Sequence, residues 1–174
     1  RAEAAAIFAR LLAEKNGDTI STAANTKFAD IPAHAWYSGY VKYLSNNGIT
    51  YGKSKTIFAP NDAITRAEFT TMAVRFFDVY GDGDAEIMEQ FSGFNDVSSG
   101  YWAAEYIKYA ALHGWINGYG DGSFHAEREI NRAEVVTIVN RLLGREADED
   151  YIADNLRKLN TFPDVTKRHW AYYA

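Results

Sequence analysis

The chain has 174 residues, of which 47% are hydrophobic and 15% aromatic, a composition typical of a folded protein with enough length to bury a core. Its net charge of −5 argues against nucleic acid or an anionic membrane as a general partner, so any bound anion needs a local site. The absence of cysteine excludes disulfides and thiolate chemistry, and no apolar run has the length of a membrane span.

Two motifs recur along the chain. The tripeptide Arg-Ala-Glu occurs three times, at 1–3, 66–68 and 132–134. The motif Phe-x-Asp-(Ile/Val)-x4-Trp begins at Phe28, Phe94 and Phe162. Residues 28–78 and 94–144 align without a gap, so the chain is an array of one unit. Because it starts inside one copy and stops inside another, we expect it to be a piece of a longer protein.

The first predicted element is a helix at the start of the chain. Its apolar positions follow i, i+3, i+4, i+7 and i+8, the stripe of an amphipathic helix: Ala4, Ile7, Phe8, Leu11 and Leu12. Gly17 lies just past its end, where a C-terminal stop belongs.

The first complete copy predicts two helices joined by a short glycine-containing connector. An aromatic helix runs from Trp36 through Tyr40 and ends at Gly48. Thr65 and Glu68 then form a capping box, which predicts the start of an amphipathic helix at Arg66.

The second complete copy repeats this pattern with a stronger turn signal. An aromatic helix begins near Trp102 and ends at Gly114, and Asp-Gly within 118–124 indicates a tight turn. Asn131 and Glu134 are the matching capping box.

The connectors suggest two further short helices, at Ala85–Phe91 and Glu149–Leu159. We therefore predict an all-α fold of tandem helix-loop-helix repeats. The three apolar stripes are most simply buried against one another, as a three-helix bundle with pseudo-threefold symmetry.

The Arg-Ala-Glu motif combines two residues with different relations to the helix. Its glutamates suit a helix start and are expected to be structural: Glu3, Glu68 and Glu134. Its arginines oppose the helix dipole at a cost of about 0.3–1 kcal/mol each: Arg1, Arg66 and Arg132. Two explanations remain open. The arginines could pair with an aspartate of an adjacent unit, namely Asp30, Asp96 or Asp164. Alternatively, free helix-start amides and a guanidinium could bind a carboxylate or phosphate.

Other recurrent residues have a structural and a functional interpretation. Trp36, Trp102 and Trp170 are expected to lie in the core, although a tryptophan near an arginine and an aspartate would also suit a sugar ring. A second set of arginines lies near the predicted helix ends, where the dipole favours a cation, and needs only a structural role: Arg10, Arg75 and Arg141. Gly52 and Gly118 indicate backbone geometry or close approach of a ligand.

No pattern of catalysis or metal binding stands out. The acidic residues between 78 and 89 miss the spacing of a Ca²⁺ loop, and the four histidines show no ligand spacing. No nucleophile–base pair is recognisable either. The repetition therefore favours a binding array without a cofactor or metal over an enzyme.

These motifs resemble the S-layer homology (SLH) module. The hallmark closing motif reads Ile64-Thr65-Arg66-Ala67-Glu68, and the central Gly-x3-Gly-x2-Asp-Gly-x-Phe motif spans 114–124. The resemblance divides the chain into part of a first repeat (1–27), a second repeat (28–93), a third repeat (94–161) and the start of a further element (162–174). It also implies three prongs around a central three-helix bundle.

The resemblance implies a non-catalytic module on the surface of a bacterium, of the Gram-positive type. Its partner would be a secondary cell-wall polymer carrying pyruvylated N-acetylmannosamine, bound in grooves between repeats, without nucleic acid or membrane insertion. The expected ligand-binding residues are Arg1, Arg66, Arg132, Asp30, Asp96, Trp36, Trp102, Gly52 and Gly118. Because 52–58 lacks the Asp-Gly turn, the groove of the first complete unit is expected to be altered or silent. The alternative is a structural module that packs against other surface-layer proteins.

Overall fold

The computed structural model describes residues 1–81, 91–155, 157–159 and 162–173. Within these ranges the protein is all-α, as predicted, and extended pairing is limited to one isolated bridge between Thr65 and Glu129. None of the described helices combines the length and apolarity needed to cross a membrane. Most of the short helix predicted at 85–91, and most of the acidic stretch before it, lie outside the described residues.

The described helices are α1 (Ala2–Asn16), α2 (Ser38–Asn46), α3 (Arg66–Tyr80), α4 (Ala104–Leu112), α5 (Arg132–Leu142) and α6 (Glu149–Asn155). Both predicted capping boxes are formed, at Thr65 and at Asn131. Gly17 ends α1 in the left-handed conformation, with φ 69°. The last predicted helix is shorter than expected, because α6 ends at Asn155 instead of Leu159.

The helices pair across the boundaries of the sequence unit. The closing helix of one copy packs against the opening helix of the next, so α1 pairs with α2 and α3 with α4. Equivalent side chains join each pair, since Arg10 donates to the Tyr40 hydroxyl and Arg75 to the Tyr106 hydroxyl. This contact gives two of the arginines near the helix ends their structural role.

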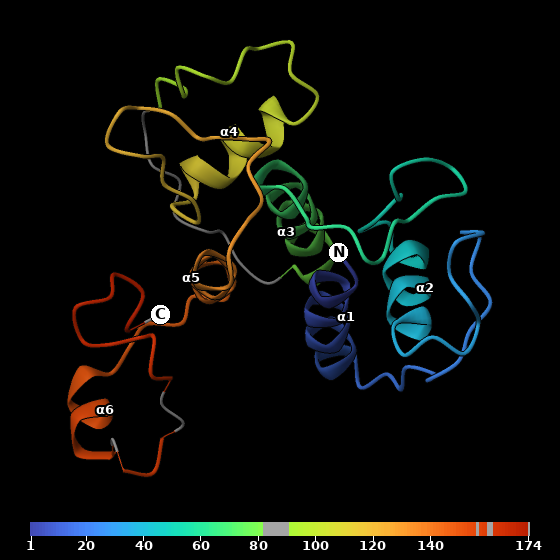
Figure 1. Cartoon of the computed structure of the whole chain (residues 1–174), viewed down its shortest axis with the longest axis horizontal. Coiled ribbons are helices and arrows are strands. Elements are labelled where there is room, and N and C mark those ends of the chain that lie inside the picture. The colour runs from blue at the N-terminus through green and yellow to red at the C-terminus, as the bar shows by residue number, and fades with distance from the viewer. Residues whose placement is uncertain (82–90, 156, 160–161, 174) are drawn as a thin grey trace.

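Helix α3 lies between α1 and α5 and packs against both (Figure 1). Phe8 of α1 contacts Phe69 and Phe76 of α3, with ring centroids 5.2 and 5.0 Å apart. Among the described residues α1 and α5 do not pack against each other. Two interfaces of the predicted bundle are therefore formed, and its pseudo-threefold closure stays a prediction. Helix α6 and the C-terminal segment lie beyond α5, on the side away from α1 and α2 (Figure 1).

The prediction that the recurrent tryptophans lie in the core is wrong. Trp36 and Trp102 precede their helices instead of starting them, and each is 55% exposed, while Trp170 is 64% exposed. Phenylalanines fill the core instead, and the fully buried ones are Phe8, Phe28, Phe58, Phe69, Phe76 and Phe124.

Candidate functional site

The start of α3 is a seam between two repeats. The Arg66 amide donates to the carbonyl of Arg128 and the Ala67 amide to that of Ala126, both at 2.9 Å. The Ile130 amide returns a bond of 3.0 Å to Ile64. Helix-start amides are usually available to an anion. Here the next repeat occupies them, so the expectation that they are free is wrong at α3.

The guanidinium of Arg66 clamps the same two repeats together. Its Nη1 forms a 2.8 Å ion pair with Oε1 of Glu134, and its Nε donates to the carbonyl of Phe124 at 2.9 Å. Arg66 is only 5% exposed. A buried charge needs such partners, because removing an ion from water costs on the order of several kcal/mol. The cost of an arginine at a helix start is thus offset by an ion pair with the following repeat.

The ion pair between a motif arginine and a motif glutamate also forms one repeat earlier, at Arg1. Among the described residues it is not formed one repeat later, at Arg132. Nη1 of Arg1 lies 2.6 Å from Oε1 of Glu68, and its Nε donates to the carbonyl of Phe58 at 2.8 Å. Arg132, the third copy, is exposed and makes no hydrogen bond or ion pair with the residues that the structure describes. The partner of the motif arginine is therefore the motif glutamate of the next unit.

The recurrent aspartates act within their own repeats. Asp96 accepts hydrogen bonds from the amides of Phe124 and His125, both at 2.7 Å, and Asp30 accepts from those of Phe58 and Ala59. Of the two alternatives left open by the sequence, the ion pair between a motif arginine and an aspartate is therefore not formed among the described residues, where Arg1 and Arg66 pair with glutamates. Burial would raise the pKa of Asp96, but these hydrogen bonds together outweigh it and lower that pKa below its ordinary value.

The recurrent glycines allow the opening motif to pack under the central turn. A Cβ on Gly118 would lie 2.5 Å from the ring of Phe94, and a Cβ on Gly52 would lie 2.4 Å from that of Phe28. Gly52 also has a φ of 80°, which an L-residue rarely adopts. The turn at 52–58 has the same backbone hydrogen bond as the turn at 118–124. The backbone amide of Lys53 donates to the carbonyl of Ile57, and that of Tyr119 to the carbonyl of Ser123, each at 2.8 Å.

Beside the Arg66 clamp lies a groove with a volume of about 340 Å³, which is within the range of small-molecule sites. Four segments of the chain contribute to it: the start of α3, the turn that follows α4, one face of α5, and the C-terminal segment. The groove is lined by Arg66, Trp115, Ile116, Asn117, Gly118, Tyr119, Glu134, Thr137, Ile138, Arg141 and Trp170.

The inner end of the groove is a network around Glu134. Its Oε1 accepts hydrogen bonds from Arg66, from the Tyr119 hydroxyl at 2.8 Å and from Arg128. Burial alone would raise the pKa of Glu134, but the amide of Asn131, Tyr119 and the two arginines outweigh it and lower that pKa. The carboxylate is therefore ionised at neutral pH and balances part of the positive charge beside it.

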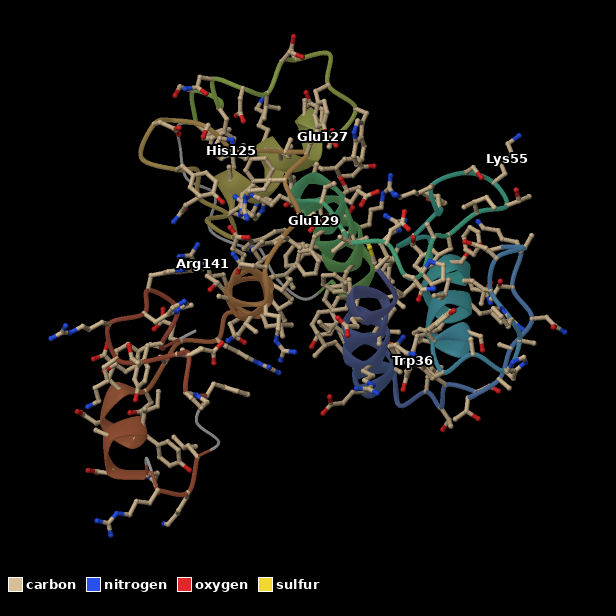
Figure 2. The ribbon with its side chains drawn as sticks, viewed as in Figure 1. Trp36, Lys55, His125, Glu127, Glu129 and Arg141 are labelled. Carbon is tan, nitrogen blue, oxygen red and sulfur yellow. The ribbon has the colours of Figure 1, made fainter. Side chains whose placement is uncertain are left out.

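The groove also combines aromatic surface with a second cation. Trp170 and Arg141 both line it, and Figure 2 shows Arg141 on α5, on the side facing the C-terminal segment. Aromatic faces can stack on the apolar face of a sugar ring, and guanidinium groups bind carboxylates in a bidentate manner. The arrangement is therefore suited to a sugar that carries an acidic group.

Of the predicted binding residues, the structure brings Arg66 and Gly118 together in this groove. Asp96 lines a separate depression of about 480 Å³ with Tyr101, His125 and Arg128. The remaining predicted residues line neither of these two sites: Arg1, Arg132, Asp30, Trp36, Trp102 and Gly52.

Sequence reasoning missed most of the groove. It did not select Glu134, Tyr119, Arg141 or Trp170 as binding residues, although two signals were present. Trp170 belongs to the recurrent opening motif, and Arg141 to the second set of recurrent arginines. Among the described residues, no cluster of His, Asp or Glu could hold a metal ion.

Comparison with known proteins agrees with the motifs. The S-layer homology domain family matches residues 27–70 and 93–136. The chain is 32% identical, over 99% of its length, to a cellulosome-anchoring protein of Acetivibrio thermocellus, and 34% identical, also over 99%, to cell surface glycoprotein 1 of that organism. It is 33% identical, over 82%, to a surface-layer 125 kDa protein of Lysinibacillus sphaericus.

The chain spans only part of each of these relatives, covering 36%, 7% and 12% of their lengths, respectively. The two matched segments each contain one opening motif and one closing motif, and together they make up half of the chain. The chain thus belongs to the S-layer homology domain family, with two tandem repeats matched.

Proposed function

We propose that this chain is a non-catalytic anchoring module that attaches the protein carrying it to the bacterial cell surface. Its ligand is an acidic glycan of the cell wall, of the pyruvylated N-acetylmannosamine type, bound in the groove beside Arg66. Membership of the S-layer homology family supports surface anchoring, as do the names of the anchoring and surface-layer relatives. The protein would then act outside the cell, on a wall of the Gram-positive type.

The observation that carries the glycan assignment is the composition of the groove. Three aromatic side chains line it: Trp115, Tyr119 and Trp170. Two arginines, Arg66 and Arg141, line it as well. A pyruvyl ketal presents a carboxylate beside a sugar ring, and this pair of features fits a cation next to an aromatic face.

Catalysis is not part of this proposal. The groove holds one carboxylate, Glu134, and it is engaged by two arginines, a tyrosine and a backbone amide. A general acid needs a raised pKa and a free proton, whereas the pKa of Glu134 is lowered. The module would hold its ligand without transforming it.

The test is co-sedimentation of the purified chain with bacterial walls. We expect it to pellet with walls that retain the pyruvylated polymer and to stay in the supernatant with walls from which that polymer has been extracted. Equal pelleting with both walls would contradict glycan anchoring. It would favour the alternative, a module that packs against other surface-layer proteins, for which the exposed Trp36 offers an apolar contact.

A further inference from the structure

The groove beside Arg66 has a counterpart one repeat earlier, beside Arg1. A shift of 66 residues aligns the lining positions between 115 and 141 with positions 49–75. Four of the lining residues are unchanged by this shift, and each is followed here by its counterpart: Gly118 and Gly52, Glu134 and Glu68, Thr137 and Thr71, Arg141 and Arg75. The motif arginines correspond as well, since each forms an ion pair with its motif glutamate. The first unit thus keeps both arginines, the glutamate and the threonine of the groove.

One lining position carries a much larger side chain in the first unit. Asn117 lines the groove on the turn that follows α4, and its counterpart on the turn that follows α2 is Tyr51. The centre of the Tyr51 ring lies 4.7 Å from the central guanidinium carbon of Arg75. The counterparts of these two residues, Asn117 and Arg141, both line the groove of the second unit, one on the turn and the other on α5. The contact between Tyr51 and Arg75 therefore spans the same space in the first unit.

Two cations hold the ring of Tyr51 in this position. Arg75 is itself fixed, because its Nε and Nη2 donate to the Tyr106 hydroxyl at 3.2 and 3.1 Å. The Nζ of Lys27 lies 5.7 Å from the centre of the Tyr51 ring as well. Cations are attracted to the face of an aromatic ring, so these contacts favour a single orientation of the tyrosine.

The glycine three residues before Tyr51 gives a second measure of the space that the ring fills. A Cβ on Gly48 would lie 3.6 Å from the Tyr51 hydroxyl. A Cβ on Gly114, its counterpart, would meet no atom of the described residues within 4 Å. The tyrosine thus also covers the region beside Gly48, and Asn117 does not cover the equivalent region beside Gly114.

The helix wall of the first unit carries a covered polar group. Thr71 of α3 is 3% exposed, and its hydroxyl has no hydrogen-bond partner among the described residues. Its counterpart Thr137 lines the groove of the second unit. Since buried hydroxyls nearly always have a partner, Thr71 keeps a hydrogen-bonding capacity that a ligand in an opened groove could use.

The backbone of the turn does not distinguish the two units. The sequence predicts an altered or silent first groove because 52–58 lacks the Asp-Gly turn. The turn nevertheless forms the backbone hydrogen bond of the second unit, from the Lys53 amide to the Ile57 carbonyl. The side chain of Tyr51 therefore offers a more direct reason for a silent groove.

We propose that Tyr51 closes the groove of the first unit, so that this chain binds its glycan only in the groove beside Arg66. Replacing the ring with the asparagine of the second unit would open a second site for the same ligand. This inference rests on the proposed glycan function. It names the side chain that sets the number of binding sites on the module.

The experiment is an NMR titration with pyruvylated N-acetylmannosamine that follows the tryptophan indole N–H signals of both units. Trp115 and Trp170 line the groove beside Arg66, and Trp102 is the counterpart of Trp170 in the first unit. In the wild type we expect saturable shifts at Trp115 and Trp170 and none at Trp102. In Tyr51→Asn the indole of Trp102 should shift as well, and the shift should saturate.

Two further variants make the test specific to the ring. Tyr51→Phe keeps the aromatic face that contacts Arg75, so Trp102 should stay in place. Asn117→Tyr is the reverse exchange in the second unit and should abolish the shifts at Trp115 and Trp170. Thermal unfolding of each variant shows whether the fold is retained. We expect Tyr51→Asn to unfold with the wild type, because Tyr51 is 55% exposed.

The outcomes separate this inference from the function on which it rests. If the wild type shows no saturable shift at Trp115 or Trp170, the proposed glycan site fails and the inference with it. If both shift in the wild type and Tyr51→Asn leaves Trp102 in place, only the role of Tyr51 is overturned. A saturable shift at Trp102 in the wild type would also overturn it, because the first groove would then bind ligand with the ring present.

Discussion

At the scale of single residues, the motif arginine occupies an unfavourable position in its own helix because it makes a contact with the next repeat. An arginine in the first turn of a helix opposes the helix dipole, and this chain places one there in all three copies. Arg66 resolves the conflict by pairing with Glu134, while the same glutamate also caps its own helix through Oε2. The closing motif is therefore a reciprocal device, in which each copy supplies an arginine to the next copy and a glutamate to the previous one.

The buried clamp predicts a large stability effect at one motif arginine and a small one at another. Arg66→Met should lower the free energy of unfolding by about 3 kcal/mol, because it leaves the remaining charges of a buried network incompletely paired. Arg132→Met, the same change at an exposed and unpaired copy, should stay within about 0.5 kcal/mol of the wild type. Urea denaturation measures both, and equal losses in the two variants would refute the clamp.

At the scale of the elements, the sequence predicted where helices start better than it predicted how the residues beside them are placed. Apolar stripes and capping boxes located the starts of α3 and α5, because those signals are local. Helical spacing alone could not place Trp36, since a large aromatic next to a helix start satisfies the same pattern whether it faces the core or solvent. The structure puts it before α2 and leaves it exposed.

The partner of the motif arginine was equally beyond the reach of the sequence. Asp96 and Glu134 both recur with Arg66, so spacing could not decide between the two carboxylates. The decision is made at the end of the turn, where the amides of Phe124 and His125 donate to Asp96, while Glu134 is left to pair with Arg66.

The hydrogen bonds between Asp96 and the backbone amides of the turn predict different losses of stability at two equivalent aspartates. Asp96→Ala should cost about 2 kcal/mol of stability, because it removes an ionised acceptor from the amides of Phe124 and His125. Asp164→Ala changes the equivalent residue of the third opening motif, which is exposed and bonds no turn in the described chain, so its cost should be close to zero. Chemical denaturation of the two variants tests this, and a null effect at Asp96 would show that the turn does not depend on its carboxylate.

At the scale of the whole molecule, one groove draws on three successive units. Arg66 comes from one closing helix, Glu134 and Arg141 from the next, and Trp170 from the following opening motif. The copy at 94–144 supplies most of this lining, and Arg66 and Trp170 come from its two neighbours, so the tandem arrangement completes the groove. This assembly also explains why the sequence motifs identified the family but did not predict the groove. The residues that line the groove lie up to 104 positions apart in the sequence, from Arg66 to Trp170.

The claim that this groove is the glycan site is tested most directly by the four tryptophan indole N–H signals in an NMR titration with pyruvylated N-acetylmannosamine. We expect the indole of Trp170 to shift in a saturable manner, together with that of Trp115 on the groove wall, while the indole of Trp36 stays in place as an exposed control. Saturable shifts at Trp36 with none at Trp170 or Trp115 would contradict the assignment.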